Sequence, residues 1–267
     1  MRILLPPSEA KHTGGRGRSL ATRGPRQPID DVRRQVLDAL ALLLVTPAAA
    51  PSLLLPPSVA AEAISQNLAV ETSPTMPAIR RYSGIVYDGL GFAALPAPVQ
   101  ALASRQVLIF SGLFGVLSGA EAVPAYRVPA KAALPGLGIL ATFWRSRLAG
   151  LMPSMLGRGG LILDLRSTDY AAMWQPEAGS KIADRLLAVR VQSIKPDGSY
   201  GVISYSSKLA KGRLAAAALQ AQAAGQRLRS PADIAELWTD LGGSDARTGR
   251  GRIGHTLDLF EADARPR

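Results

Sequence analysis

The segment "LLPPSEAK" (residues 4–11) shows the pattern from which the fold of this chain is predicted. A short apolar run, typical of a buried strand, stops at two prolines, and a serine, a glutamate and a lysine follow within four positions. Proline ends such a run because its nitrogen carries no hydrogen for the ladder between strands. The segment therefore predicts a core strand over residues 2–5, whose end delivers Ser8, Glu9 and Lys11 to one place.

Three further strand-like runs end in small or hydroxyl residues beside a basic one. Ser111 leads toward Arg127, Ser167 follows Arg166, and Ser204 precedes Lys208 and Lys211. Ligands gather at strand ends in open sheets, because the loops there carry polar groups without disturbing the core. The recurrence predicts one composite anion site. Serine or glycine after a strand is also ordinary turn chemistry, and the glycines of "SGLFG" (residues 111–115) could simply allow close packing.

The remaining patterns predict helices between these strands. Helices are expected over residues 30–44, over 58–70 with Ser58 as cap, after "SYSSKLAKGR" (residues 204–213), and from Ser230 with a proline at its first position. A β-hairpin is expected to turn at residues 195–198. The predicted fold is mixed α/β, one compact domain over residues 1–267, with a central mixed sheet flanked by helices. The tail from about residue 243 is expected to be loose.

Composition excludes several kinds of site. The chain has 267 residues, no cysteine and two histidines. Disulfides, thiolate zinc sites, iron–sulfur clusters and cysteine nucleophiles are therefore absent by inventory. His12 and His255 lie far apart in the sequence, and no pair of carboxylates at helical spacing is visible that could hold iron. The sequence predicts no metal site and no cofactor.

The charge of the chain favours an anionic partner. Lys and Arg number 31 and Asp and Glu number 20, which gives a net charge of +11. A basic loop over residues 11–29 has no acid between Glu9 and Asp30, and it is either a mobile arm or a loop that embraces phosphate. Alternatively, the codon usage of a GC-rich genome accounts for part of the excess of basic over acidic residues, without a function.

No targeting or membrane segment is expected. The apolar run after Met1 is too short for a signal peptide. The longer run over residues 36–55 contains Asp38, Pro47 and Pro51, so it is interpreted as a buried helix followed by a loop. These observations predict a protein that does not enter a membrane, and they leave its oligomeric state open.

The chain resembles the YaaA family of peroxide-stress proteins in the order of the blocks "LLPPSEAK", "YSGIVYDGLG", "FSGLFGVL" with "PAYR", "FW", "LDLRSTDY" and "SYSSKLAKG". The resemblance spans roughly residues 3–212. The resemblance implies a cytoplasmic bacterial protein of mixed α/β fold with a positively charged cleft. It also implies that the protein binds double-stranded DNA and limits free iron and iron-dependent DNA damage. It also implies an element resembling a helix-hairpin-helix at about residues 58–80, although no glycine for its turn occurs between Pro51 and Gly84. The family's motif positions are occupied by Ser8, Lys11, Gly84, Tyr87, Gly89, Ser111, Gly112, Gly115, Tyr126, Arg127, Ser167, Tyr170, Ser204, Lys208 and Gly212.

Two functions follow from these residues. The first is a DNA-binding protein of the peroxide-stress response, whose predicted contacts to the DNA backbone are Arg16, Arg18, Arg80 and Arg81. The second is an enzyme that makes or breaks a bond in a nucleobase, nucleoside or nucleotide. In this enzyme Lys11 or Lys208 holds phosphate or acts as base, and Glu9 or Asp169 is the acid or base. Tyr87 or Tyr126 stacks on a ring or donates a proton. Its candidate catalytic residues are Ser8, Glu9, Lys11, Tyr87 and Lys208. Its candidate anion-binding and ligand-binding residues are Ser111, Gly112, Gly115, Tyr126, Arg127, Ser167, Tyr170, Ser204 and Lys211.

Overall fold

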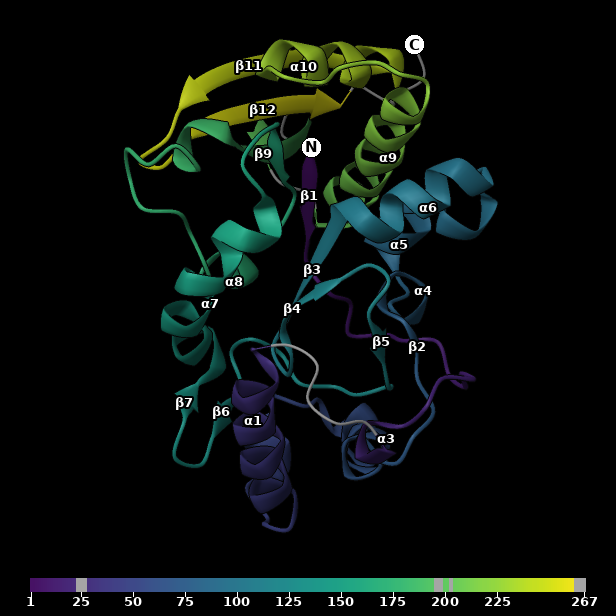
Figure 1. The fold of residues 1–267 in the computed structure, drawn as a ribbon, viewed down its shortest axis with the longest axis vertical. Coiled ribbons are helices and arrows are strands. Elements are labelled where there is room, and N and C mark those ends of the chain that lie inside the picture. The colour runs from purple at the N-terminus through teal and green to yellow at the C-terminus, as the bar shows by residue number, and fades with distance from the viewer. Residues whose placement is uncertain (23–27, 195–198, 202–203, 262–267) are drawn as a thin grey trace.

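The computed structural model describes residues 1–22, 28–194, 199–201 and 204–261, with the backbone alone at 193, 194 and 204. An eight-stranded sheet in the order β11-β12-β9-β8-β1-β3-β4 forms its centre, and β10 pairs with β9 beside this path (Figure 1). The strands are β1 (Arg2–Leu5), β3 (Val107–Ser111), β4 (Gly115–Ser118), β8 (Ile162–Asp164), β9 (Leu186–Ile194), β10 (Tyr200–Gly201), β11 (Gly243–Arg250) and β12 (His255–Glu261).

The inner strands run parallel and the outer ones do not. β1 pairs in parallel with β3 and with β8, so that Ile3 lies opposite both Val107 and Leu163. β9 is parallel to β8 and to β12, whereas β4 and β11 pair antiparallel with their neighbours. The sheet is therefore mixed, as the sequence predicts. Two short pairs lie apart from it: β2 (Met76–Pro77) with β5 (Ala122–Val123), and β6 (Ala133–Leu134) with β7 (Gly138–Ile139).

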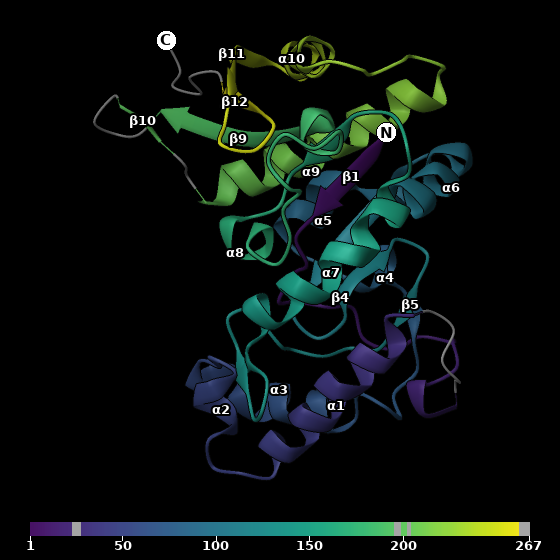
Figure 2. The same cartoon turned by 60° about the vertical axis from the view of Figure 1, so that its left-hand side comes forward.

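Helices cover the sheet and build the far end of the molecule. Figure 1 shows α5, α6 and α9 on one side of β1 and β3, with α7 and α8 on the other, and Figure 2 places α1, α2 and α3 at the end away from β11 and β12. The helices are α1 (Asp30–Leu44), α2 (Ala49–Ser52), α3 (Pro57–Leu68), α4 (Ala78–Arg81), α5 (Ile85–Leu90), α6 (Ala97–Gln106), α7 (Leu140–Leu156), α8 (Thr168–Ala171), α9 (Ser204–Ala223) and α10 (Pro231–Asp240), with 3-10 turns at Leu20–Thr22, Phe92–Ala94 and Ala183–Arg185.

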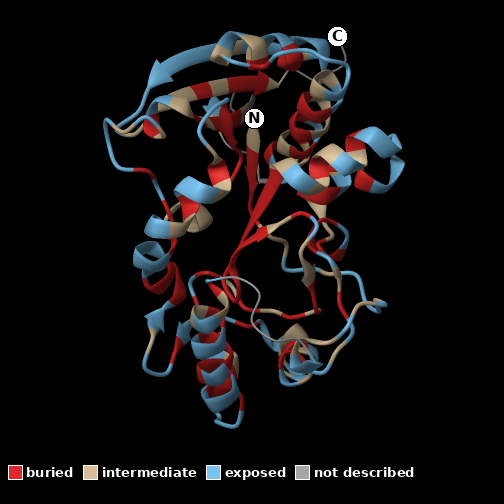
Figure 3. Ribbon diagram, in the orientation of Figure 1, coloured by how far each residue is buried: buried red, intermediate tan, exposed pale blue. Residues whose placement is uncertain are grey.

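The core lies around the central strands. Ile3, Leu4 and Leu5 of β1 are fully buried, and every residue of β3 is buried (Figure 3). A parallel strand covered by helices on both faces has no side that needs polar residues, which explains the continuous apolar runs. Among the described residues, no helix is both long and apolar enough to cross a membrane.

Several predicted element boundaries are confirmed. β1 covers residues 2–5, and α1 begins and ends at the predicted positions. α10 begins after Ser230, whose hydroxyl accepts a hydrogen bond from the Asp233 N–H while the Asp233 carboxylate accepts one from the Ser230 N–H. This reciprocal pair satisfies two amides that the helix leaves free.

Other predicted boundaries are wrong. α3 begins at Pro57 with Pro56 as its cap, because proline suits the first turn, where no amide hydrogen is needed. Ser58 is therefore inside the helix. The family resemblance also implied a helix-hairpin-helix at about residues 58–80. The place of its second helix is taken by α4, which has only four residues and is separated from α3 by β2. The predicted turn at 195–198 lies outside the described residues.

The prediction of a loose tail from residue 243 is also wrong up to residue 261. β11 and β12 form an antiparallel hairpin, and β12 pairs in parallel with β9 over six residue positions from His255↔Leu187 to Phe260↔Gln192. Leu257 and Leu259 are fully buried in this arrangement. The alternation of "HTLDLF" (residues 255–260) is the pattern of a half-buried strand, and pairing with β9 fixes it.

Two glycines set the spacing between α5 and α9. A Cβ atom on Gly212 would lie 2.1 Å from the Val86 carbonyl oxygen, and one on Gly89 would lie 2.3 Å from the Leu209 carbonyl oxygen. Any larger residue would push the two helices apart. Gly89 of "YDGLG" and Gly212 of "KLAKG" therefore allow the close packing of α5 against α9.

Candidate functional site

The predicted strand ends meet at one edge of the sheet. Because β1, β3 and β8 are parallel neighbours, the segments that follow Leu5, Ser111 and Asp164 leave the sheet on the same side. Lys11, in the first of these segments, forms an isolated antiparallel bridge with Tyr82, which directly follows α4. The bridge carries the lysine back over the end of the sheet.

The Lys11 side chain lies on a layer of aromatic rings. Its Nζ donates to the Ser8 carbonyl oxygen at 2.9 Å and lies 4.2 Å from the ring centroid of Tyr126 and 5.2 Å from that of Tyr82. Burial lowers the pKa of Lys11 to about 7, against the opposing effect of the Glu9 carboxylate, and Arg127 and Arg81 lower it further. Near neutral pH a large share of the amine is thus unprotonated, the form that acts as base or nucleophile.

A chain of buried hydroxyls lies beneath the lysine. The phenol oxygens of Tyr82 and Tyr126 are 2.5 Å apart, and the Tyr126 phenol oxygen is 2.6 Å from Ser111 Oγ, which accepts a hydrogen bond from the Phe114 N–H at 3.0 Å. Burial raises the pKa of Tyr82 and of Tyr126, so both phenols stay protonated. We call Lys11, Tyr82, Tyr126 and Ser111 the lysine–tyrosine cluster. It combines two protonated phenols with an amine that is partly neutral near pH 7.

Charged groups stand at the solvent side of this cluster. Glu9 Oε2 lies 3.2 Å from Arg127 Nε, and their side chains are 51% and 24% exposed. The Arg127 backbone is fixed by buried Asn67, whose amide accepts from the Arg127 N–H at 2.8 Å and donates to the Arg127 carbonyl at 3.0 Å. Burial and the nearby Glu9 carboxylate raise the pKa of Tyr170. Glu9, Arg127 and Tyr170 thus form a polar rim that could hold an anionic, hydrogen-bonding ligand.

The glycines of "SGLFG" serve packing. A Cβ atom on Gly112 would lie 2.5 Å from the Val128 carbonyl oxygen, and one on Gly115, at φ +73°, would lie 2.7 Å from the Trp144 ring. The Trp144 indole also donates to the Gly112 carbonyl at 2.7 Å. The packing alternative raised from the sequence accounts for both glycines, and neither has a ligand-facing role that the structure supports.

Arg166 and Lys211 brace the end of β8. Arg166 forms two hydrogen bonds with the Asp164 carboxylate, at 2.8 and 2.6 Å, donates to the Trp174 carbonyl at 2.9 Å, and lies 4.2 Å from the Phe110 ring centroid. Lys211 donates to the Arg166 carbonyl at 3.3 Å, and burial lowers the pKa of Lys211. The Arg166 side chain is therefore used inside the protein, and Lys211, a predicted ligand-binding residue, contacts its backbone carbonyl.

Two predicted site residues face inward instead. Tyr87 is buried, donates its hydroxyl to the Pro6 carbonyl at 2.8 Å and stacks on Tyr82 with ring centroids 5.5 Å apart, so it cannot stack on a substrate. Arg81 is fully buried and donates to the carbonyls of His12, Gly14, Pro74 and Val123. A buried guanidinium needs such partners, and Arg81 is therefore unavailable to a DNA backbone.

The other predicted residues lie at the surface. Arg16 and Arg18 are exposed in the described part of the basic loop, and residues 23–27 of that loop lie outside it. Arg80 donates to the Gln100 side chain at 2.9 Å and lies 4.9 Å from the Phe92 ring centroid. Asp169 pairs with Lys131 at 2.9 Å. Lys208 and Ser167 are exposed, and the Ser204 side chain is not described.

The strand-end pattern thus brings together part of the predicted set. Lys11, Glu9, Ser111, Tyr126 and Arg127 share one site through the contacts above. Ser8 contributes its carbonyl, and Lys208 has no contact with the cluster among the described residues. Sequence reasoning missed Tyr82 and Asn67. Tyr82 opens the block "YSGIVYDGLG" and could have been chosen, whereas Asn67, one amide in a helix, carries no local signal.

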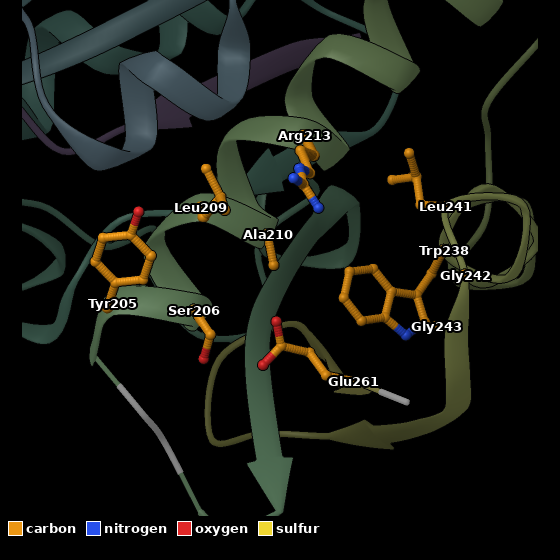
Figure 4. A pocket seen from close by; sticks show the side chains of 10 residues that line it. All are labelled: Tyr205, Ser206, Leu209, Ala210, Arg213, Trp238, Leu241, Gly242, Gly243 and Glu261. Carbon is orange, nitrogen blue, oxygen red and sulfur yellow. The ribbon is translucent and has the colours of Figure 1, made fainter. Parts of the chain in front are cut away.

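A second hollow lies apart from the lysine–tyrosine cluster. Its volume is about 240 Å³, and α9, α10, β11 and β12 enclose it (Figure 4). Trp238 and Leu241 lie across it from Leu209 and Tyr205, and Arg213 and Glu261 add charge. Neither lysine of the "KLAKG" block is among its lining residues. Within the described ranges, no group of three or more histidine, aspartate or glutamate residues is placed to hold a metal ion.

Comparisons with known proteins agree with these blocks. The family model described as peroxide stress protein YaaA matches residues 1–240. A UPF0246 protein of Streptomyces coelicolor is 36% identical over 245 residues, which cover 91% of this chain and 90% of the relative. A UPF0246 protein of Corynebacterium glutamicum is 37% identical over 216 residues, or 80% of this chain and 83% of the relative. The chain therefore belongs to the YaaA family of peroxide stress proteins.

Proposed function

We propose that this member of the peroxide-stress family is an enzyme that binds an anionic small molecule of the nucleobase, nucleoside or nucleotide class and uses Lys11 as its base. The observation that carries the proposal is the Lys11 amine, which lies over two tyrosine rings with its pKa lowered to about 7 by burial. A strongly perturbed lysine beside specific partners is typical of reactive centres.

The neighbouring groups suit this role. The neutral amine accepts a proton from the substrate, and the ammonium that forms is stabilised by the Tyr126 ring and the Ser8 carbonyl. Arg127 holds the anionic part of the substrate, and Glu9 accepts a hydrogen bond from an N–H or O–H group of the substrate, because both side chains lie at the exposed rim. Tyr170, partly exposed on the same rim, contacts the ring. The hydrogen bonds of the Tyr82, Tyr126 and Ser111 hydroxyls fix the rings over which the lysine lies.

A ligand screen with matched variants tests the proposal. Thermal unfolding is measured at pH 8 with nucleobases, nucleosides and nucleotides, and any stabilising compound is followed by mass spectrometry for conversion. Wild type and Lys208→Met, whose lysine is exposed on α9, should be stabilised equally. Lys11→Met should lose conversion while keeping its fold. The absence of any shift across the three compound classes, or equal conversion by Lys11→Met, would contradict the proposal.

A second candidate is duplex DNA binding in the cytoplasm, as the family resemblance implies. The net charge of +11 and the exposed Arg16, Arg18 and Arg80 favour it. Contacts to phosphates would make affinity fall steeply with salt. Fluorescence anisotropy of a labelled duplex across a salt series should show this fall, and Arg16→Ala/Arg18→Ala should reduce its slope. Affinity that stays constant across the series would exclude this kind of binding.

The two candidates separate in cells. A strain that lacks the gene is complemented with wild type, Lys11→Met or Arg16→Ala/Arg18→Ala, and survival and DNA lesions after peroxide are measured. Rescue by the arginine variant but not by Lys11→Met supports the enzyme. The reverse result supports DNA binding as the means by which the protein limits iron-dependent DNA damage.

A further inference from the structure

β11 (Gly243–Arg250) is the terminal strand of the sheet in the described part of the chain, and β12 is its partner on one side (Figures 1 and 2). Six of its eight residues are exposed. The family model ends at residue 240, so this strand is not part of what the match to the family describes. An edge strand offers a row of N–H and C=O groups that can pair with another strand.

The sequence of β11 is symmetric in its chemistry. The segment "GSDARTG" (residues 243–249) has Ala246 at its centre, with opposite charges on either side of it, then two hydroxyl residues, then two glycines. In an antiparallel pair of two copies related by a two-fold axis at Ala246, Asp245 of one copy faces Arg247 of the other, and Ser244 faces Thr248. A surface that is complementary to itself is what a two-fold dimer requires.

The positions of the side chains agree with this pairing. Asp245 and Arg247 leave the same face of β11, where Asp245 Oδ2 and Arg247 Nε are 3.0 Å apart and the side chains are 50% and 67% exposed. Arg247 also lies 4.6 Å from the ring centroid of Phe260 on β12, which orders it on that face. Directly opposed residues of an antiparallel pair bring their Cβ atoms within about 5 Å, so the two carboxylates and two guanidiniums of a dimer would alternate at contact distance.

The backbone is regular only from Asp245 onward, so the pairs that would carry the dimer are Asp245 with Arg247 and Ala246 with its own copy. A bulge lies between Gly243 and Asp245, and the Ser244 hydroxyl donates toward β12 backbone carbonyls. The regular part of the strand therefore begins at Asp245. The Ala246 N–H donates to Asp245 Oδ1 at 2.8 Å, so one side chain both satisfies this amide and neutralises Arg247 in the single chain. In a dimer, the second copy would offer a backbone carbonyl to the Ala246 N–H and its Asp245 carboxylate to Arg247.

We infer that β11 is a homodimer surface through which two copies of this chain pair antiparallel about Ala246, which continues the sheet from one copy into the other. The contact is confined to the strand edges and a few side chains. Small contacts of this kind give weak association, so we expect the dimer to be reversible and to depend on protein concentration.

Charge exchange tests the pairing register. Sedimentation velocity over a concentration series should show a monomer–dimer equilibrium for wild type. Arg247→Asp places like charges opposite each other twice per dimer and should weaken association roughly tenfold or more. The exchange Asp245→Arg/Arg247→Asp restores the complementarity and should restore the dimer. Arg250→Asp makes the same change in charge at a position that faces Gly242 of the second copy, outside the paired segment, and should have little effect.

Single cysteines test the axis, because the natural chain has none. Ala246→Cys lies on the two-fold axis and should form an intermolecular disulfide on oxidation. Thr248→Cys faces Ser244 and should not. Circular dichroism confirms that each variant is folded. The inference is overturned by a monomer at all concentrations, by cross-linking at residue 248 instead of 246, or by failure of the double exchange to restore association. Asp245 would then be a charged side chain that hinders pairing at an exposed strand edge.

Discussion

Replacing Lys11 with methionine should change how the stability of the protein depends on pH. In the folded protein the pKa of Lys11 is about 7, whereas its ordinary value is 10.5. Between these two values the unfolded chain binds a proton at Lys11 that the folded protein does not. The free energy of unfolding of the wild type therefore rises with pH across this window. Methionine keeps the length and apolar stem of the side chain and carries no proton.

The size of the effect follows from the shift. The full difference in pKa would raise the wild-type free energy of unfolding, relative to Lys11→Met, by about 2 kcal/mol between pH 7 and pH 9. Because Lys11 is partly exposed, solvent screening reduces this to about 1 kcal/mol. The raised pKa values of the buried tyrosines affect both proteins in the same way, and they act above this range.

Urea unfolding measures this difference. The chain has three tryptophans, all buried, so their fluorescence reports unfolding at pH 6, 7, 8 and 9. Lys208→Met is the matched control, and its difference from wild type should not change with pH. If wild type and Lys11→Met gave parallel stability curves, the amine would be charged at neutral pH. That result would remove the physical basis of the proposed base.

Three further substitutions test a close helix contact, a buried ion pair and a helix cap. Gly212→Ala should destabilise the protein by about 2 kcal/mol or more, because its Cβ would meet the Val86 carbonyl; a thermal midpoint within a degree of wild type would contradict the close helix contact. Arg166→Met should cost about 3–5 kcal/mol, since it leaves the Asp164 carboxylate buried and unpaired, and recovery in Asp164→Asn/Arg166→Met would identify that charge as the cause. Ser230→Ala should cost about 1 kcal/mol in urea unfolding by removing the cap of α10, whereas Ser154→Ala, on the exposed face of α7, should be neutral.

Much of the site could be predicted because it depends on local order along the chain. A buried apolar run followed by prolines and polar residues fixes where β1 ends, and parallel pairing then brings the segments after β1, β3 and β8 together. Lys11, Ser111 and Arg127 were found in this way. The family resemblance rests on the same blocks, and the matched residues confirm it.

Local order does not show which polar groups the protein uses internally. Arg81 stands beside Arg80 in the sequence, yet Arg81 is buried among four backbone carbonyls and Arg80 reaches the surface. Tyr87 donates to Pro6, far away in the chain. These outcomes depend on which loop carbonyls lack a partner once the strands have packed, and that is a property of the whole fold.

The sequence by itself determined the mixed α/β class, the family, the ends of the central strands and the basic character of the chain. Only the tertiary structure decided that Lys11 lies on tyrosine rings, because Tyr82 and Tyr126 are far from Lys11 and from each other in the sequence. It also decided that the C-terminal segment forms strands. The charged and glycine-rich residues of β11 favour a loose chain, but pairing with β12, which β9 anchors, supplies the hydrogen bonds and apolar burial that order it.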